Sequence, residues 1–231
     1  MTAAPKVPAA GALPAQAQPP AVPWGSAPPP PRILLYGGTF DPPHLGHLNN
    51  LRAAMAAVRP DRVVVMPAGT PPHKAASATP ARHRLAMCRC FAALGPGVTV
   101  SRWEIDQGGR SYTVRTLEML RAAWPGAQLY LAVGSDMLLS FRQWRDWRRI
   151  LQLAALVVES RQAGDESALQ AMARSLAADG GQVLFAQAPA FVCASSTLRA
   201  RLAAGDAAAL DLLPASVADY IKKYDLYHLQ K

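Results

Sequence analysis

Short apolar runs alternate with longer segments whose apolar residues recur at helical spacing, from about residue 32 onward. The runs predict strands at residues 33–36, 62–67, 98–101, 128–133, 153–158 and 182–186. The helical spacing predicts helices at residues 46–58, 80–94, 111–124, 141–151, 165–178, 195–203 and 214–223. Strands that alternate with helices are typical of an open parallel α/β sheet with helices on both faces. Ligands of such sheets bind beyond the carboxyl ends of the strands, so the loops after strands are the places to search for function.

Residues 1–31 differ in composition from the rest of the chain. They hold ten of the 21 prolines, nine alanines and a single charged residue, Lys6. Proline lacks a backbone donor, and few large apolar side chains are present, so the segment cannot build a core. We expect a disordered or polyproline-II-like extension at residues 1–31, with a docking tail as the alternative, and one folded domain at residues 32–231.

The overall composition narrows the class of protein. The formal net charge of +9 suits an anionic partner, either a polyphosphate or a nucleic acid. A run of five or more Lys or Arg is absent, which disfavours nucleic acid. The apolar runs, such as residues 154–158, are far shorter than the roughly 20 residues that span a bilayer, and a secretory signal is not recognised. We therefore expect a soluble, cytoplasmic protein with no membrane partner.

The three cysteines predict no disulfide framework. Cys88, Cys90 and Cys193 are odd in number and lack regular spacing. Cys88 and Cys90 would also point to nearly opposite faces of a helix, which is a poor start for a zinc site. We expect all three to be reduced thiols.

The loop at residues 37–47 follows the first predicted strand and carries the strongest chemical pattern. Gly37 and Gly38 allow the backbone to approach a phosphate closely, and the amides at the start of the next helix favour an anion. His44 and His47 are three residues apart at that helix start, so they share one face. Gly46 between them predicts an open patch for a flat base. Two alternatives are a strand–turn–helix with incidental histidines and a metal site, for which further ligands at suitable spacing are missing.

A second anion-binding pattern lies late in the chain. Ser195, Ser196 and Thr197 cluster at a predicted helix start, where their hydroxyls can cap the helix or bind phosphate. Arg199 on the same turn can reach the same anion with its fork of donors. The alternative is an ordinary Ser/Thr cap followed by a surface arginine.

The sequence from about residue 32 to 229 resembles a known family. His44-Leu45-Gly46-His47 resembles the His-x-Gly-His element of the nucleotidyltransferase superfamily that includes class I aminoacyl-tRNA synthetases, and residues 37–47 look specifically like bacterial nicotinate-nucleotide adenylyltransferases. Other segments resemble that family in order: residues 71–74, 111–113 with 116–117, 134–136 with Trp144, 195–199, and 213–214 with 220–221. The late motif departs from the family where Cys193-Ala194 stands in place of the common isoleucine, which should alter packing only.

The resemblance implies a Rossmann-like fold and transfer of the adenylyl group of ATP to nicotinate mononucleotide, with Mg²⁺ accompanying the ATP. The residues implied in charge stabilisation are His44, His47, Lys74 and Arg199. The residues implied in ATP binding are Gly37, Gly38, Thr39, Phe40, His44, His47, Gly134, Asp136, Ser195, Ser196, Thr197 and Arg199, with Asp136 on a ribose hydroxyl or the metal. The residues implied in acceptor binding are Lys74, Tyr112, Thr113 and Trp144, with Trp144 stacked on the pyridine from a helix that it shares with Trp147.

Three other functions remain open at this point. A pantetheine-phosphate adenylyltransferase shares the His-x-Gly-His loop but does not account for residues 111–113 with Trp144. A tRNA synthetase needs an anticodon-binding part, for which the chain is too short, and a Lys-rich late loop, which is missing. A nucleotide sensor without catalysis is disfavoured by the presence of His44, His47 and Arg199.

Overall fold

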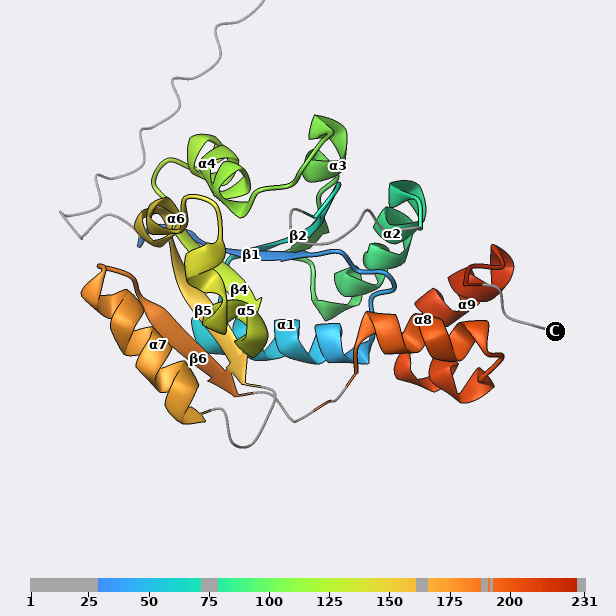
Figure 1. Ribbon diagram of the computed structural model, residues 1–231. Helices are drawn as coiled ribbons and strands as arrows, with labels where there is room; N and C mark the ends of the chain where they lie inside the picture. Colours follow the sequence, from blue (N-terminus) through green and yellow to red (C-terminus); the bar gives the residue numbers. More distant parts are fainter. Residues whose placement is uncertain (1–28, 72–78, 161–165, 188–190, 192, 228–231) are drawn as a thin grey trace, which may run out of the picture.

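The computed structural model describes residues 29–71, 79–160, 166–187, 191 and 193–227 (Figure 1). The elements are β1 (Arg32–Gly38), α1 (Leu45–Val58), β2 (Arg62–Pro67), α2 (Ala81–Met87), η1 (Cys88–Leu94), β3 (Val98–Val100), α3 (Trp103–Gln107), α4 (Thr113–Ala123), β4 (Gln128–Gly134), α5 (Ser135–Leu139), η2 (Phe141–Gln143), α6 (Trp147–Leu153), β5 (Ala154–Ser160), α7 (Glu166–Ala178), β6 (Val183–Gln187), α8 (Ser195–Ala203), η3 (Ala207–Leu212) and α9 (Ala215–Lys223), where η marks a 3₁₀ helix. The strands pair in parallel in the order β3-β2-β1-β4-β5-β6.

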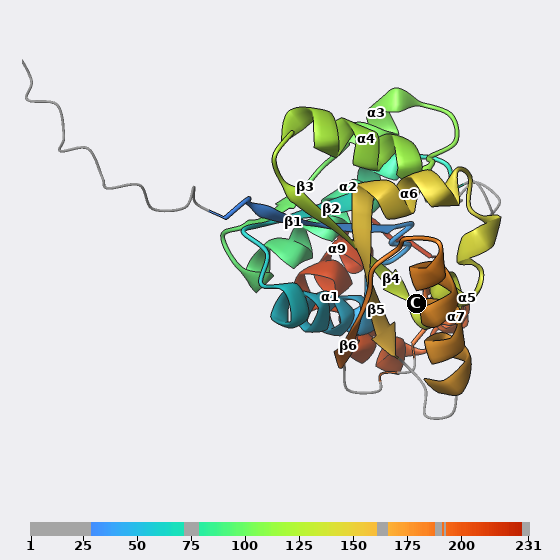
Figure 2. The same cartoon turned by 90° about the vertical axis from the view of Figure 1, so that its left-hand side faces the viewer.

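The sheet is buried on both faces because the middle of each central strand is apolar. In β1, Leu34 and Tyr36 face one core, while Ile33 and Leu35 face the other, as the two-residue period of a strand requires. Helices α1, α8 and α9 pack in the first core, and α4, α6 and α7 pack in the second. Figures 1 and 2 show α1 and α4 on opposite sides of the sheet. The predicted Rossmann-like sheet with helices on both faces is confirmed.

The predicted strands are confirmed, with ends that shift by at most two residues. The predicted helix at residues 80–94 is instead α2 followed by the 3₁₀ helix η1. Pro80 occupies the N-cap position of α2, and the buried Thr79 accepts a hydrogen bond from Arg84 through its carbonyl oxygen. Short elements are where the sequence pattern was insufficient, because α3, α5 and η3 are too brief to show a helical period.

The predicted helix at residues 141–151 is also wrong. The segment breaks into η2 and α6, and Trp144 lies between them with an extended backbone, so Trp144 and Trp147 do not share a helix. Asp146 makes the break with a left-handed backbone, at φ 53°. The segment contains no glycine or proline, so the break could not be predicted from the residue types.

Two further expectations can be compared with the structure. Cys88, Cys90 and Cys193 are free thiols, as expected. Burial raises the pKa of the Cys88 thiol well above its ordinary value and that of Cys90 to about 12. Within the described part of the chain, we find no helix with the length and apolar character needed to cross a membrane.

Candidate active site

The strand order places two of the predicted loops side by side. After β1 the chain moves to β2 on one side, whereas β4 lies on the other side of β1, so the order reverses between β1 and β4. Tyr36 near the end of β1 pairs with Ala132 near the end of β4. The loop after β1 and the segment Gly134–Asp136, where β4 ends and α5 begins, therefore lie at the same edge of the sheet. Open α/β sheets bind their ligands at such a reversal point.

The two histidines of the first loop lie against each other, as predicted. His44 is the N-cap of α1 and His47 is on its first turn, with ring centroids 3.7 Å apart. The backbone N–H of His44 donates to Nδ1 of His47 at 3.2 Å. A ring nitrogen that accepts a hydrogen bond carries no proton, so the proton of the neutral His47 ring lies on Nε2. His47 is therefore organised as a hydrogen-bond donor through Nε2.

Gly46 does not provide the open patch that the sequence suggested. The residue is buried, and a Cβ built on it would lie 3.0 Å from Nδ1 of His44 and 3.0 Å from the ring of Phe191. The ring of His44 folds back over the first turn of α1, and Phe191 approaches from the segment before α8. Glycine is required here by close packing of aromatic rings.

Phe40 fixes the shape of the loop after β1. Its backbone has φ 50°, a left-handed conformation that is uncommon outside glycine, and its ring is buried against Tyr36, His47 and Phe91. A Cβ at Gly38 would lie only 2.8 Å from that ring. Gly38 thus makes room for Phe40, whose buried side chain anchors the loop.

Helix α8 docks on the same loop. Arg199 donates from Nη1 to the carbonyl oxygen of Asp41 at 2.7 Å, and the same nitrogen lies 3.7 Å from Oδ2 of Asp41. Ser195 donates from Oγ to the carbonyl oxygen of Pro42 at 3.0 Å. Two predicted anion-binding segments, more than 150 residues apart in sequence, therefore meet at one edge of the sheet. The Arg199 side chain stays 40% exposed, so part of its fork remains open to solvent.

Sequence reasoning assigned no role to Asp41 or Tyr227. The Asp41 side chain is 4% exposed, and Tyr227 donates from its hydroxyl to Oδ1 of Asp41 at 2.7 Å. Burial first, and then the neighbouring Asp41 carboxylate, raise the pKa of Tyr227 far above its ordinary value. We call residues 37–47 the glycine-histidine loop. The available signal for Asp41 was the presence of an acidic residue inside this loop. For Tyr227 the sequence offered none, because its partner lies 186 residues away.

The hydroxyls at the start of α8 do not cap the helix. Ala194 is the N-cap residue, and no side chain caps this helix end. Ser195 instead bonds Pro42, while Ser196 and Thr197 are exposed on the first turn. The capping interpretation was wrong by one residue, and the anion-binding interpretation of Ser196 and Thr197 stays a prediction.

Three predicted acceptor residues, Tyr112, Thr113 and Trp144, lie on the face of the sheet that carries the second core. Helix α4 begins at Thr113, with Tyr112 as its N-cap. The guanidinium of Arg145 lies 4.7 Å from the Tyr112 ring centroid. Hydrogen bonding to Arg145 is the main cause that lowers the pKa of Tyr112, and Arg110 adds to it. Trp144 packs against Phe141, with centroids 5.4 Å apart.

A buried carboxylate holds the start of α4 against the loop after β2. Glu104 accepts a hydrogen bond from Thr116 at 2.5 Å, and burial raises its pKa while hydrogen bonds from Thr116 and Ser111 lower it. Ser111 accepts from the backbone N–H of Gly69 at 2.9 Å. The N–H of Ser111 already donates to Thr70, so it is not one of the open donors at this helix start. The sequence did not single out Glu104, because α3 was not predicted.

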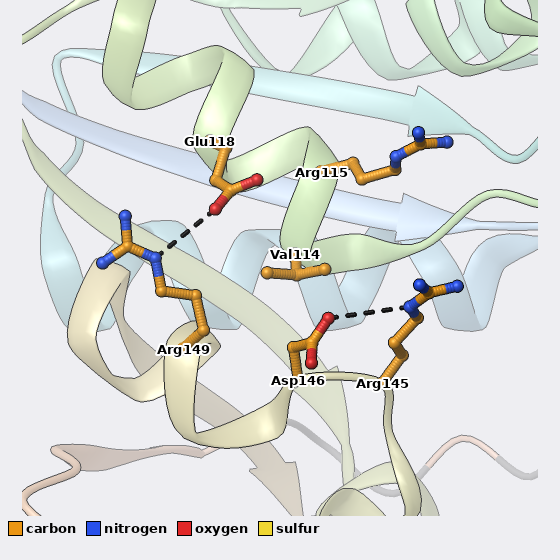
Figure 3. Close-up of a pocket in the computed structure, with 6 residues that line it drawn as sticks. All are labelled: Val114, Arg115, Glu118, Arg145, Asp146 and Arg149. Carbon is orange, nitrogen blue, oxygen red and sulfur yellow. Dashed lines mark hydrogen bonds and ion pairs between the residues drawn. The ribbon is translucent and has the colours of Figure 1, made fainter.

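Figure 3 shows a pocket between α4 and the turn before α6. Its lining residues are Val114, Arg115, Glu118, Arg145, Asp146 and Arg149. Arg149 pairs with Glu118 at 3.4 Å, and Arg145 pairs with Asp146 at 3.6 Å (Figure 3). None of the predicted site residues in the described part of the chain lines this pocket. Val114 and Arg145 directly follow Thr113 and Trp144 in the sequence, so the pocket adjoins these two predicted acceptor residues.

Asp136 and Lys74 are two further predicted site residues. Asp136 is exposed on the first turn of α5, directly after β4. Lys74 lies outside the described residues, so its assignment stays a prediction. In the residues that the structure describes, three or more His, Cys, Asp or Glu side chains do not gather into a group able to hold a metal ion.

Comparisons with known proteins identify the class of this protein. Residues 35–201 match the cytidylyltransferase-like family, so the chain is a nucleotidyltransferase. A protein named "Probable nicotinate-nucleotide adenylyltransferase" from Acidithiobacillus ferrooxidans is 38% identical over 84% of this chain and 95% of its own length. One of the same name from Gemmatimonas aurantiaca is 40% identical over 85% and 92%. The chain belongs to the nicotinate-nucleotide adenylyltransferase family.

Solved structures share the fold. The Plasmodium falciparum nicotinic acid mononucleotide adenylyltransferase complexed with APC superposes with a TM-score of 0.70, at 20% identity over 87% of this chain and 98% of that chain. The same enzyme complexed with NaAD gives a TM-score of 0.67, at 18% identity over the same shares of the two chains. At these identities the likeness supports the fold alone.

Proposed function

We propose that this protein transfers the adenylyl group of ATP to nicotinate mononucleotide, forming nicotinate adenine dinucleotide and pyrophosphate in the biosynthesis of NAD. A phosphate oxygen of the mononucleotide attacks the α-phosphorus of ATP. The bond from that phosphorus to the oxygen bridging the β-phosphorus breaks, and pyrophosphate leaves with the electron pair. No protein nucleophile takes part. The observation that carries the proposal is the docking of α8 on the glycine-histidine loop, which joins two anion-binding patterns at one sheet edge.

Both reactants are anions, so the enzyme must supply positive charge and position more than covalent chemistry. We assign His44, His47 and Arg199 to the triphosphate, with Nε2–H of His47 and the open part of the Arg199 fork as donors. Lys74 belongs to the same proposed set. The backbone at Gly37, Gly38, Thr39 and Phe40 and the hydroxyls of Ser195, Ser196 and Thr197 complete the proposed ATP contacts, together with Gly134.

Mg²⁺ is proposed to accompany ATP, and the oxygen atoms at this edge suit it. The Asp41 carboxylate is already engaged by Tyr227 and Arg199. Asp136 is the exposed carboxylate on the turn after β4, and we assign it to the ion or to a ribose hydroxyl. When bound to the triphosphate, Mg²⁺ supplies neutralisation of its negative charge. The residues described above orient the phosphates.

The acceptor is proposed to lie at the start of α4. Tyr112 and Thr113 present the first turn of this helix, whose unpaired N–H groups and positive end suit a carboxylate. Trp144 offers an aromatic face for the pyridine, now from the turn between η2 and α6. The neighbouring Arg145 adds positive charge on the same side.

Release of pyrophosphate tests the function directly. The full chain is incubated with ATP and Mg²⁺ and, in turn, with nicotinate mononucleotide, nicotinamide mononucleotide, phosphopantetheine or no acceptor. We expect pyrophosphate and the dinucleotide in equal amounts with nicotinate mononucleotide. If phosphopantetheine were the acceptor that caused pyrophosphate release and neither mononucleotide did, the protein would be a pantetheine-phosphate adenylyltransferase. If ATP bound and no acceptor caused pyrophosphate release, the protein would be a nucleotide sensor.

A further inference from the structure

Arg84 on α2 is a buried arginine whose side chain binds only backbone oxygens among the hydrogen bonds of the described residues. The residue is 2% exposed. Nη1 donates to the carbonyl oxygens of Thr39 at 2.9 Å and Ala68 at 2.7 Å. Nη2 donates to Gly69 at 3.0 Å, and Nε donates to Thr79 at 3.3 Å. One guanidinium thus holds four carbonyl oxygens.

Three of these four oxygens belong to the loops that follow β1 and β2, and the fourth, that of Thr79, lies just before α2. Thr39 lies in the loop after β1, which carries the two histidines, whereas Ala68 and Gly69 lie in the loop after β2. The backbone N–H of Gly69 in turn donates to Oγ of Ser111, directly before α4. A continuous path of hydrogen bonds therefore runs from the ATP loop through Arg84 to the acceptor helix.

Burial makes this arginine costly to retain. Loss of hydration lowers the pKa of Arg84, while the negative charge of Asp41 raises it and so favours the charged form. The described hydrogen bonds of Arg84 all go to carbonyl oxygens, so backbone dipoles and the charge of Asp41 together offset the loss of hydration. A buried charge costs free energy when its lost hydration is only partly replaced by other contacts. In some proteins such a charge is retained because it specifies one arrangement of the surrounding backbone.

We propose that Arg84 is a positioning residue that sets the separation between the loop after β1 and the loop after β2, and hence between ATP and the acceptor phosphate. The inference rests on the adenylyl transfer proposed above. Transfer needs the attacking oxygen about 3–3.5 Å from phosphorus, and a displacement of about 1 Å can lower the rate roughly 10²-fold. The proposed ATP contacts lie mainly on the loop after β1 and on α8, whereas the proposed acceptor contacts lie at the start of α4, which Gly69 and Ser111 tie to the loop after β2. A change in loop separation should therefore lower kcat more than it raises either KM.

The chain contains a matched control in Arg121. This residue donates to the carbonyl oxygens of Pro125, Ala127 and Leu153 at 3.2, 2.6 and 3.1 Å. These acceptors lie where β4 and β5 begin, at the opposite edge of the sheet from the proposed site. Arg121 therefore also links backbone segments through its guanidinium, but none of its described bonds goes to the loop after β1 or the loop after β2.

The experiment compares Arg84→Lys and Arg84→Met with Arg121→Lys and Arg121→Met. Lysine keeps the charge but cannot reproduce the planar fork that reaches several oxygens at once. Melting temperature, kcat and the KM values for ATP and nicotinate mononucleotide are measured below the lowest melting temperature. We expect Arg84→Lys to lower kcat about 10- to 100-fold with each KM within about threefold. The Arg121 variants should melt earlier with kcat unchanged.

A kcat for Arg84→Lys equal to that of Arg121→Lys, or a loss confined to one KM, would overturn the inference. Should both Arg84 variants fail to fold, Ser111→Ala decides, because it removes the last link of the path while leaving the core intact. This variant should also lose kcat, and unchanged kcat would overturn the inference. Absence of dinucleotide with the wild-type chain would instead overturn the proposed function itself.

Discussion

The two sides of the candidate site are held by different kinds of interaction. On the phosphate side, the buried Asp41 joins Arg199 and Tyr227 across 158 and 186 residues of sequence. On the acceptor side, Arg145 lies over Tyr112 and pairs at 3.6 Å with Asp146, and both charged side chains of that pair are 61% exposed. The first side is held by partly buried hydrogen bonds. On the second side Glu104 holds the start of α4 from inside, whereas the contacts of Arg145 with Tyr112 and Asp146 lie at the surface.

This difference has energetic consequences. A hydrogen bond to a charged group contributes about 1.5–3 kcal/mol, whereas exposed ion pairs contribute about 0–1 kcal/mol because solvent screens them. The phosphate side is therefore set before substrates arrive, which suits stabilisation of charge during transfer. The acceptor side can adjust to the ring it receives. We expect substitutions on the first side to lower kcat and substitutions on the second to change KM and the choice of acceptor.

Removal of the His47 ring should have the largest effect. His47→Ala eliminates the Nε2–H donor, and loss of one such donor commonly lowers turnover about 10²–10³-fold. His47→Asn separates structure from chemistry, since its amide oxygen can still accept from the His44 N–H but nothing replaces Nε2. Both variants should lose kcat with a smaller change in KM. Steady-state kinetics would contradict the role if folded His47→Ala or His47→Asn kept a kcat near that of the wild type.

His83→Ala is the control for this series. His83 lies on α2, and its Nδ1 is 3.1 Å from the hydroxyl of Tyr220 on α9. Its removal should leave kcat within about threefold, as expected for a side chain outside the reacting region. A kcat loss as large as that of His47→Ala would mean that the assay reports general damage.

The sequence predicted the parts of this site that depend on local pattern. The glycine pair, the paired histidines and α8 follow from spacing along a few residues, and the structure brings them together at one edge. Tertiary partners were not predictable in the same way. Tyr227 and Arg84 form hydrogen bonds with carboxylate or carbonyl oxygens of residues that are distant in the sequence. The left-handed backbone at Asp146 occurs at a residue other than glycine, so the residue type did not indicate the turn.

Acceptor selectivity should be the next largest effect. Nicotinate presents a carboxylate to the first turn of α4, whereas a carboxamide turns its own N–H donors toward the same donors. Each mismatched buried polar group costs roughly 1–3 kcal/mol, so two would give a preference of about 10²-fold or more, at about tenfold per 1.4 kcal/mol. We expect kcat/KM to be that much higher for nicotinate mononucleotide than for nicotinamide mononucleotide, measured at one ATP concentration.

Trp144→Ala separates stacking from recognition of the carboxylate. A ring contact does not distinguish the two acceptors, so this variant should lower kcat/KM for both by a similar factor. Equal efficiency with the two acceptors in the wild type, or a preference for the amide, would mean that the pyridine lies elsewhere.

Loss of the Tyr227 hydroxyl should have a smaller effect, mainly on stability. Tyr227→Phe removes the bond to the buried Asp41 carboxylate and keeps the ring. At about 1.5–3 kcal/mol for such a bond and about 2–4 °C per kcal/mol for a chain of this size, the melting temperature should fall by about 3–12 °C. Tyr224→Phe is the control, because Tyr224 is 46% exposed and its described contacts are made by the ring. Equal melting temperatures for the two variants would remove Tyr227 from the phosphate side.

The smallest effect should come from shortening the chain at its N-terminus. We propose that the nucleotidyltransferase domain comprises residues 32–231, because β1 begins at Arg32 and residues 1–31 lack a core-forming pattern.

The stability of a shortened chain should depend on whether the cut falls before Pro31 or after Arg32. The carbonyl oxygen of Pro31 accepts from the N–H of Gln128 at 2.8 Å, and the N–H of Arg32 donates to Asp61 at 2.7 Å. A chain that begins at Pro31 keeps both bonds, so its melting temperature and kcat/KM should equal those of the full chain. A chain that begins at Ile33 loses both and should melt several degrees lower, at about 1 kcal/mol per hydrogen bond. A large loss of activity in the first shortened chain would show that the extension reaches the phosphate or acceptor side, and would make it part of the site.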